Sequence, residues 1–265
     1  MRAGKRRCNL SGARFVIRVK SFGNFAWVGI QARLISSRQI EKEKGMSLSA
    51  PGFLRGVFEK HWRWIESKGK DGCRADLRGA DLSRLNLQGI NLAHALLSNA
   101  VLAGAILRSA DLRGARLERA CLDRTDLHWA NLSKANLDSA SLKDAQLQFA
   151  NFDQACLAGA CLRGAFLHNA WFWQADCQRA DFSQASLNFS CFGSANLQES
   201  KFDLAKLQHT DMRESDLRNS GIPSAEILSA DFRGANLPDG FSSFMSDPAG
   251  RSCSVSLTNQ LKRGK

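Results

Sequence analysis

Residues 75–109 read ADLRG ADLSR LNLQG INLAH ALLSN AVLAG AILRS, which is seven five-residue units in an unbroken register. The register continues to residue 239 through 33 consecutive units without an insertion or a deletion. The third position is Leu in 23 units and Phe in six, and the first position is Ala in 25. A period of five fits neither an α-helix nor a flat β-strand, so the sequence predicts a solenoid of stacked repeats.

This A(D/N)LXX pattern resembles that of the pentapeptide-repeat family, and the resemblance covers residues 75–239. It implies an all-β solenoid, a right-handed quadrilateral β-helix of about eight coils with four units in each square coil. A wall of five residues leaves room inside for one large apolar side chain and one small one. We therefore expect the third-position Leu or Phe and the first-position Ala to point inward. The second, fourth and fifth positions should face solvent, with the second-position Asp or Asn bonding the turn backbone.

Residues twenty positions apart should lie above one another on the same wall. One interior column then holds a run of bulky third-position side chains in its later coils, namely Phe152, Phe172, Phe192, Met212 and Phe232. At the ~4.8 Å spacing of paired strands, the rod should be roughly 38 Å long.

The segment before the repeats is predicted to cover the first coil. Residues 46–74 should form a helical N-terminal cap, because apolar residues recur at helical spacing from Phe53 to Ile65. Such a cap is needed because a stack of coils leaves an unpaired edge at each end. His61 in this helix is interpreted as a packing residue on the helix face. Residues 240–265 are predicted to be a C-terminal cap and a disordered tail, with Phe241, Phe244 and Met245 closing the last coil.

The net charge of +12 is unevenly spread along the chain. Residues 1–74 carry +12, residues 75–239 carry −3 and residues 240–265 carry +3. The rod is thus slightly acidic, and we expect it not to bind nucleic acid directly. That partner remains open only for the basic N-terminal extension.

Residues 1–45 are expected to be a basic extension that is either disordered or not part of the native chain, with Met46 as the natural start. Three alternatives stay open: a secretory signal, an organelle transit peptide, and a genuine basic tail that contacts nucleic acid or anionic lipid. No apolar run approaches the ~18 residues of a membrane-spanning helix, so no span is predicted.

The eight cysteines show no C-x-x-C spacing. Zinc knuckles and redox motifs use that spacing, so we expect structural, reduced cysteines and a cytoplasmic location.

The sequence predicts no enzyme, no cofactor and no metal site. No G-x-S-x-G, H-E-x-x-H or P-loop string occurs. His128 and His168 fall in one outward column, but they are two coils apart, roughly 9–10 Å, which is too far for a shared metal.

A cluster of outward aromatic side chains is the candidate interaction patch: Trp129, Phe149, Phe166, Trp171, Trp173 and Phe189. Three of them share one corner column, which Asn169 interrupts and His209 follows. One interpretation is that these rings are partly buried against each other. The other is a surface for protein binding or self-association, since clustered exposed aromatics are typical of interfaces.

These features favour a non-enzymatic scaffold of a bacterial type that mediates protein–protein interaction through its flat faces and the aromatic patch. The partner is an unidentified protein, with a homodimer as one alternative. The resemblance also implies a second function, because some family members imitate B-DNA and protect or inhibit the type II topoisomerase gyrase. That mimicry requires a strongly acidic rod, whereas this rod carries −3 and outward arginines: Arg108, Arg113, Arg116, Arg119 and Arg124. Its register also lacks the loop insertions of the quinolone-resistance branch.

Overall fold

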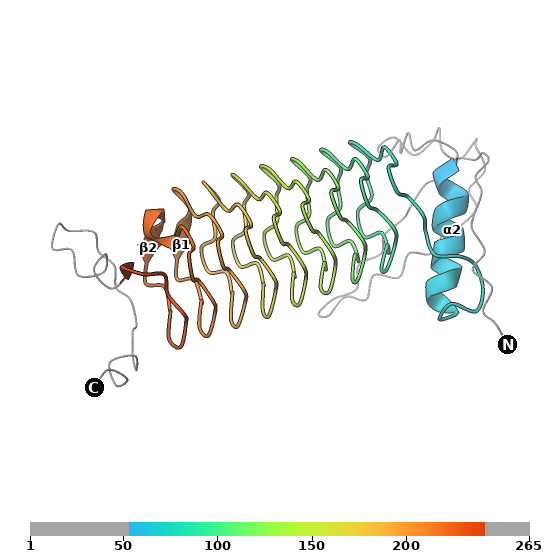
Figure 1. Ribbon diagram of the computed structural model, residues 1–265. Helices are drawn as coiled ribbons and strands as arrows, with labels where there is room; N and C mark the ends of the chain where they lie inside the picture. Colours follow the sequence, from blue (N-terminus) through green and yellow to red (C-terminus); the bar gives the residue numbers. More distant parts are fainter. Residues whose placement is uncertain (1–52, 242–265) are drawn as a thin grey trace, which may run out of the picture.

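The computed structural model describes residues 53–241. Four short elements lie in this range: helix α2 (Phe53–Glu66), strand β1 (Lys206–Gln208), 3₁₀ helix η1 (Ile222–Ser224) and strand β2 (Glu226–Leu228). Nearly all of the rest winds into stacked coils that form a rod, with α2 lying across its first end (Figure 1).

The coils have a period of twenty residues. A second-position residue pairs in parallel with the residue twenty positions later, as Asp76 does with Leu96, and this register recurs along the rod. Strands β1 and β2 keep it, with Lys206 opposite Glu226. Twenty residues are four units, in agreement with the four-walled coil. Most walls pair at a single residue, because two of every five residues form the corner turn.

Nearly every corner is a β-turn closed by a backbone hydrogen bond, for example from Ala80 N to Leu77 O at 3.1 Å. The fifth position of the unit takes a positive φ at 24 non-glycine residues and seven glycines of the repeat region. A positive φ at this place in a turn is the feature of type II turns, which favour Gly or Asn there. Stacking of the coils imposes it even on Trp129, whose φ is 61°.

The second-position Asp and Asn side chains bond the turn backbone as expected. The Oδ1 atom of Asn131 accepts a hydrogen bond from the Ser133 amide at 3.0 Å, and Asn151 accepts one from the Asp153 amide at 2.7 Å. These bonds satisfy amides that the coil-to-coil pairing leaves unpaired.

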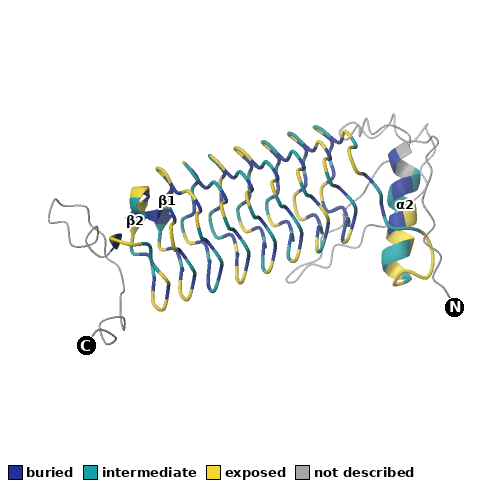
Figure 2. Cartoon of the chain, viewed as in Figure 1, coloured by how far each residue is buried: buried dark blue, intermediate teal, exposed yellow. Residues whose placement is uncertain are grey.

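The predicted inward register is confirmed, and Figure 2 shows buried and exposed segments alternating along every coil. Third-position and first-position side chains are buried almost throughout, with partly buried exceptions near the two ends at Ala80 and Leu237. Phe172 lies in a stack, with ring centroids 4.7 Å from Phe152 and 4.5 Å from Phe192. The bulkier core of the later coils is therefore a ladder of parallel rings.

Helix α2 packs on the first coil through one face. Leu54, Val57 and His61 on this face are buried. The His61 Nδ1 atom accepts a hydrogen bond from the backbone amide of Ala75 at 3.0 Å, which ties the helix to the start of the repeats. His61 is thus a packing and capping residue, as expected.

The last coil is closed by Phe241, which is buried and makes an edge contact with Phe232 at 5.4 Å. Phe244 and Met245 lie outside the described residues. So do residues 1–45 and every alternative proposed for them. Between residues 53 and 241, no helix has the length and hydrophobicity that crossing a membrane requires.

The cysteines depart from expectation at one position. Cys121, Cys156, Cys161, Cys177 and Cys191 are free, whereas Cys73 is disulfide-bonded. Motif spacing did not reveal this bond, because a disulfide requires proximity in space and not along the chain.

Candidate interaction surface

Two histidines of the rod contact polar neighbours. His128 Nδ1 lies 2.7 Å from Asp126 Oδ1, and His168 Nε2 lies 3.1 Å from Ser186 Oγ. Within the described range, no three His, Cys, Asp or Glu side chains come together in a way that could hold a metal ion.

The aromatic side chains gather around one corner of the rod. Trp129, Phe149 and Phe189 occupy fifth positions twenty or forty residues apart, so they lie in the same corner column as Asn169 and His209. The positive φ at these positions sends their side chains out from the corner. We call these five residues the corner stack.

Two pairs within the corner stack are in contact. The Trp129 and Phe149 rings lie 4.2 Å apart with planes 3° from parallel, and Phe189 stacks on His209 at 5.0 Å. The rings of each pair therefore cover one another in part, while Trp129 and Phe189 remain 61% and 53% exposed.

Trp171 and Trp173 lie on the adjoining wall, on either side of the buried Phe172. Their exposed fractions are 54% and 45%, and neither ring takes part in a ring–ring contact within residues 53–241. The Trp173 backbone amide donates a hydrogen bond to Asp153 Oδ1 at 3.1 Å. These two indoles therefore differ from the corner pairs in having no aromatic neighbour.

Trp173 rests on the next coil at Gly193. A Cβ atom on Gly193 would lie 3.3 Å from Trp173 Cδ1, and Gly193 itself is buried. A larger residue at this place would require the indole to shift by a few tenths of an ångström. The glycine thus allows the close approach of Trp173, a relation between residues twenty positions apart that sequence reasoning missed.

Phe166 is exposed on the wall at the other side of the corner. It pairs with Gln146 and Ser186, and the column of His168 separates it from the corner stack. The structure therefore brings five of the six predicted residues around one corner and sets Phe166 at the margin.

The patch lies in an uncharged zone. On the two walls that meet at the corner, the outward residues of the three coils from Gln146 to Ser194 are amides, hydroxyls, aromatics, two small residues and one His, with Asp153 as the single formal charge. Inside this zone the Oε1 atom of Gln148 is buried without a hydrogen-bond partner. The uncharged residues of this zone are far apart in the sequence, and they lie together only after the chain is wound into coils.

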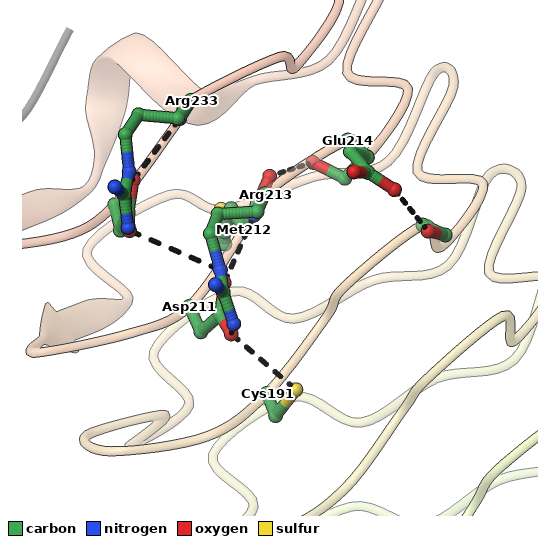
Figure 3. Close-up of polar contacts among 9 residues, drawn as sticks. Cys191, Asp211, Met212, Arg213, Glu214 and Arg233 are labelled. Carbon is green, nitrogen blue, oxygen red and sulfur yellow. Dashed lines mark hydrogen bonds and ion pairs between the residues drawn. The ribbon is translucent and has the colours of Figure 1, made fainter. Parts of the chain in front are cut away.

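Charges return in the following coils, and two of the carboxylates there are paired with arginines. Arg213 binds both carboxylate oxygens of Asp211, at 2.9 and 2.7 Å, and Arg233 binds Asp231 in the same way (Figure 3). Burial alone would raise the pKa of Asp211, but hydrogen bonds from Arg213 lower it below its usual value. Burial raises the pKa of the neighbouring Cys191 thiol, which donates to Asp211. These carboxylates stay ionised, and they border the uncharged zone.

Comparison with known proteins supports the repeat assignment. The family profile described as Pentapeptide repeats matches in eight copies, within residues 69–92, 86–124, 120–159, 130–169, 160–198 and 200–238. No curated protein matches the sequence.

Several solved structures are similar to the chain. HetL from the cyanobacterium Nostoc sp. strain PCC 7120, a pentapeptide repeat protein involved in regulation of heterocyst differentiation, is 30% identical over 62% of this chain and 81% of its own, with a TM-score of 0.33. A pentapeptide repeat protein from the thylakoid lumen of Arabidopsis thaliana is 26% identical over 46% and 72%, with a TM-score of 0.21. QnrB1, a plasmid-mediated fluoroquinolone resistance protein, is 17% identical over 64% and 94%, with a TM-score of 0.25.

Proposed function

Because the chain belongs to the pentapeptide-repeat family, whose members form right-handed quadrilateral β-helices, we propose that it is a non-enzymatic scaffold that binds another protein through its aromatic patch. The cytoplasmic location that the sequence led us to expect was based on reduced cysteines; it stays a prediction, which the five free cysteines favour and the disulfide-bonded Cys73 does not. A rigid rod suits this role, because its walls hold side chains at fixed spacings without a change of backbone conformation.

The exposure of Trp171 and Trp173 carries the proposal. Large aromatic side chains bury ~150–250 Å² each when covered, and they are the residues most often responsible for binding energy at interfaces. Both indoles stand on a wall whose inward neighbour, Phe172, already fills the core. Their presence is therefore not needed to fold the coil.

The test replaces both indoles with serine. The Trp171→Ser/Trp173→Ser double variant should keep the circular dichroism of the wild type, yet it should lose a protein that co-purifies with the wild type or elute as a smaller species. A matched control is Trp62→Ser, since Trp62 is 50% exposed on α2 at the end of the rod. The control should keep the wild-type partner and size. If the double variant also keeps them, the patch is not the binding surface.

Loss of a co-purifying protein and loss of self-association are different outcomes of this experiment. The first supports a heterologous partner, and the second supports the homodimer. Light scattering on the purified chain separates them, because only a homodimer has twice the monomer mass in the absence of other proteins.

A further inference from the structure

The corner stack lacks one ring. Trp129 stacks on Phe149, and Phe189 stacks on His209, but Asn169 occupies the position between the two pairs. Four of five successive coils thus place an aromatic ring at this corner, and the middle coil places a short amide there.

The spacing of the coils leaves room for one ring at this level. The ring centroids of the two corner pairs lie 4.2 and 5.0 Å apart, and those of the stacked interior phenylalanines lie 4.5–5.3 Å apart. Phe149 and Phe189 are two coils apart, so their separation is about 9–10 Å. A ring midway between them would lie at the same distance from each as the interior phenylalanines lie from one another, within the range for offset stacking.

Asn169 supplies hydrogen-bonding groups at the base of this position. Its side chain is half-buried, and within residues 53–241 its carboxamide makes no hydrogen bond. The amide offers two N–H donors and one carbonyl acceptor. A ring with a polar edge, an indole N–H or a phenol O–H, can use these groups, whereas a phenylalanine ring cannot.

The surrounding charge distinguishes among possible ligands with aromatic rings. A nucleotide or a single-stranded nucleic acid would need cationic side chains for its phosphates. In the three coils from Gln146 to Ser194, the outward residues of the two walls carry one formal charge, that of Asp153, and it is negative. The surface therefore fits an uncharged stretch of polypeptide.

We propose that a Trp or Tyr side chain of a partner protein inserts between Phe149 and Phe189, with its polar edge hydrogen-bonded to the Asn169 carboxamide. The inserted ring completes a continuous stack of five rings along the corner. This proposal rests on the proposed function, since it names the kind of side chain that the aromatic patch captures.

N-acetyl-L-tryptophanamide is the probe, titrated into the full chain while the Asn169 side-chain amide signals are followed by nuclear magnetic resonance. Saturable shifts are expected at these signals and at the Phe149 and Phe189 rings. N-acetyl-L-leucinamide should shift them at least about tenfold more weakly, because it cannot stack. Adenosine monophosphate is the third arm, and binding as strong as that of the tryptophan probe would overturn the assignment to a protein side chain.

Two variants test the position itself. Asn169→Phe should fill the gap, which raises the melting temperature and abolishes probe binding. The matched control is Gln174→Phe, at a corner of the same coil with a similar φ of 53°, and it should leave probe binding unchanged. Asn169→Ala keeps the two rings and removes the amide, so it should weaken the tryptophan probe but not N-acetyl-L-phenylalaninamide. Unchanged binding of the tryptophan probe to Asn169→Phe would refute the insertion.

Partner capture separates this proposal from the one it rests on. If Asn169→Phe retains the partner while Trp171→Ser/Trp173→Ser loses it, the patch binds protein but not through this gap. If both variants retain the partner, both proposals fail. Loss of the partner in both variants, together with an intact Gln174→Phe, supports the inserted ring.

Discussion

His61 contributes to the fold as a neutral imidazole. Its side chain is fully buried, and its Nδ1 atom accepts the Ala75 amide hydrogen bond, so the proton of the neutral ring lies on Nε2. Burial lowers the pKa of His61 to about 4, and the nearby charges of Arg74 and His94 act in the same direction, while the Ala93 backbone and Asp111 oppose it. The Nε2 atom is buried and has no hydrogen-bond partner among residues 53–241, which agrees with burial as the main cause of the lowered pKa.

This pKa predicts a loss of stability in mild acid. Between pH 6.5 and about 4 the unfolded chain binds a proton at His61 that the folded chain does not, so the free energy of unfolding falls as the pH drops through this range. The full loss corresponds to about 3 kcal/mol. Melting temperatures measured from about pH 7 to about pH 4 should show it in the wild type and much less in His61→Gln. Equal slopes for the two proteins would refute this role. Asp216, whose pKa is lowered to about 2 chiefly by its hydrogen bond to Arg218, loses its contribution only at lower pH.

Phe172 and Gln174 test the inward and outward positions of a single unit. Phe172 is fully buried between two stacked rings, whereas the Gln174 side chain makes one exposed hydrogen bond with Gln154 at 3.3 Å. Phe172→Ala should cost about 3–5 kcal/mol, since it leaves a cavity in a stack that cannot collapse. Gln174→Ala should cost less than about 0.5 kcal/mol. Chemical denaturation measures both, and similar costs would contradict the register.

At the scale of elements, helix α2 covers an edge that the repeats cannot satisfy themselves. The first coil has a paired coil on one side only, and α2 fills the other side with an apolar face. Two further contacts attach α2 to the first coil. One is the hydrogen bond between His61 and Ala75, and the other is an edge contact of Trp64 with His94, with ring centroids 6.4 Å apart. Because each coil contacts only its neighbours, a weakened cap should affect the near end of the rod first.

Leu54→Ala should therefore loosen the first coil selectively. Leu54 is fully buried on the inner face of α2, and its truncation costs about 2–5 kcal/mol. Hydrogen exchange should accelerate at amides of residues 75–95 and remain slow near residues 180–200. Trp62→Ala on the exposed side of the same helix serves as the control and should leave both regions unchanged. Uniform acceleration along the rod would mean that the solenoid unfolds as one unit.

At the scale of the molecule, several acidic side chains on the walls are paired with arginines of the same unit. A D-x-R pattern places Asp at the second position and Arg at the fourth, and each pair forms a bidentate ion pair, as in Asp111–Arg113 and Asp216–Arg218. Exposed pairs of this kind add little stability, but they cancel the negative field of the carboxylates. Together with the net charge of −3 over residues 75–239, these pairs lead us to expect that the rod does not act as a DNA mimic.

The gyrase alternative is tested directly in a supercoiling assay. We expect purified protein to leave DNA gyrase activity unchanged and to give no protection against a quinolone. The physical reason is the low net charge of the rod, only −3 over residues 75–239, in which several carboxylates are also ion-paired with arginines. Inhibition or protection of gyrase that rises with protein concentration would contradict this prediction and support the topoisomerase hypothesis.

The period of the coil, the inward register and the helix at the first end could all be predicted from the sequence. Every wall of a five-residue square coil has the same narrow interior, so each unit repeats the same requirement for one large and one small apolar side chain. Phe172 and its neighbours in the column could be identified as core for this reason. The exposed aromatic residues could also be located, because their positions in the unit face outward.

The packing of those outward rings on one another, by contrast, is visible only in the folded chain. Trp129 and Phe149 stack, whereas Trp171 and Trp173 stand without aromatic neighbours and Trp173 rests on Gly193. The disulfide at Cys73 and the uncharged zone around Asp153 likewise appear only in the folded chain. The interior is constrained by the same wall geometry in every unit, while an outward side chain has several rotamers available. Which rotamer an outward side chain adopts depends on the side chain twenty residues away, because the winding of the coil places the two side by side.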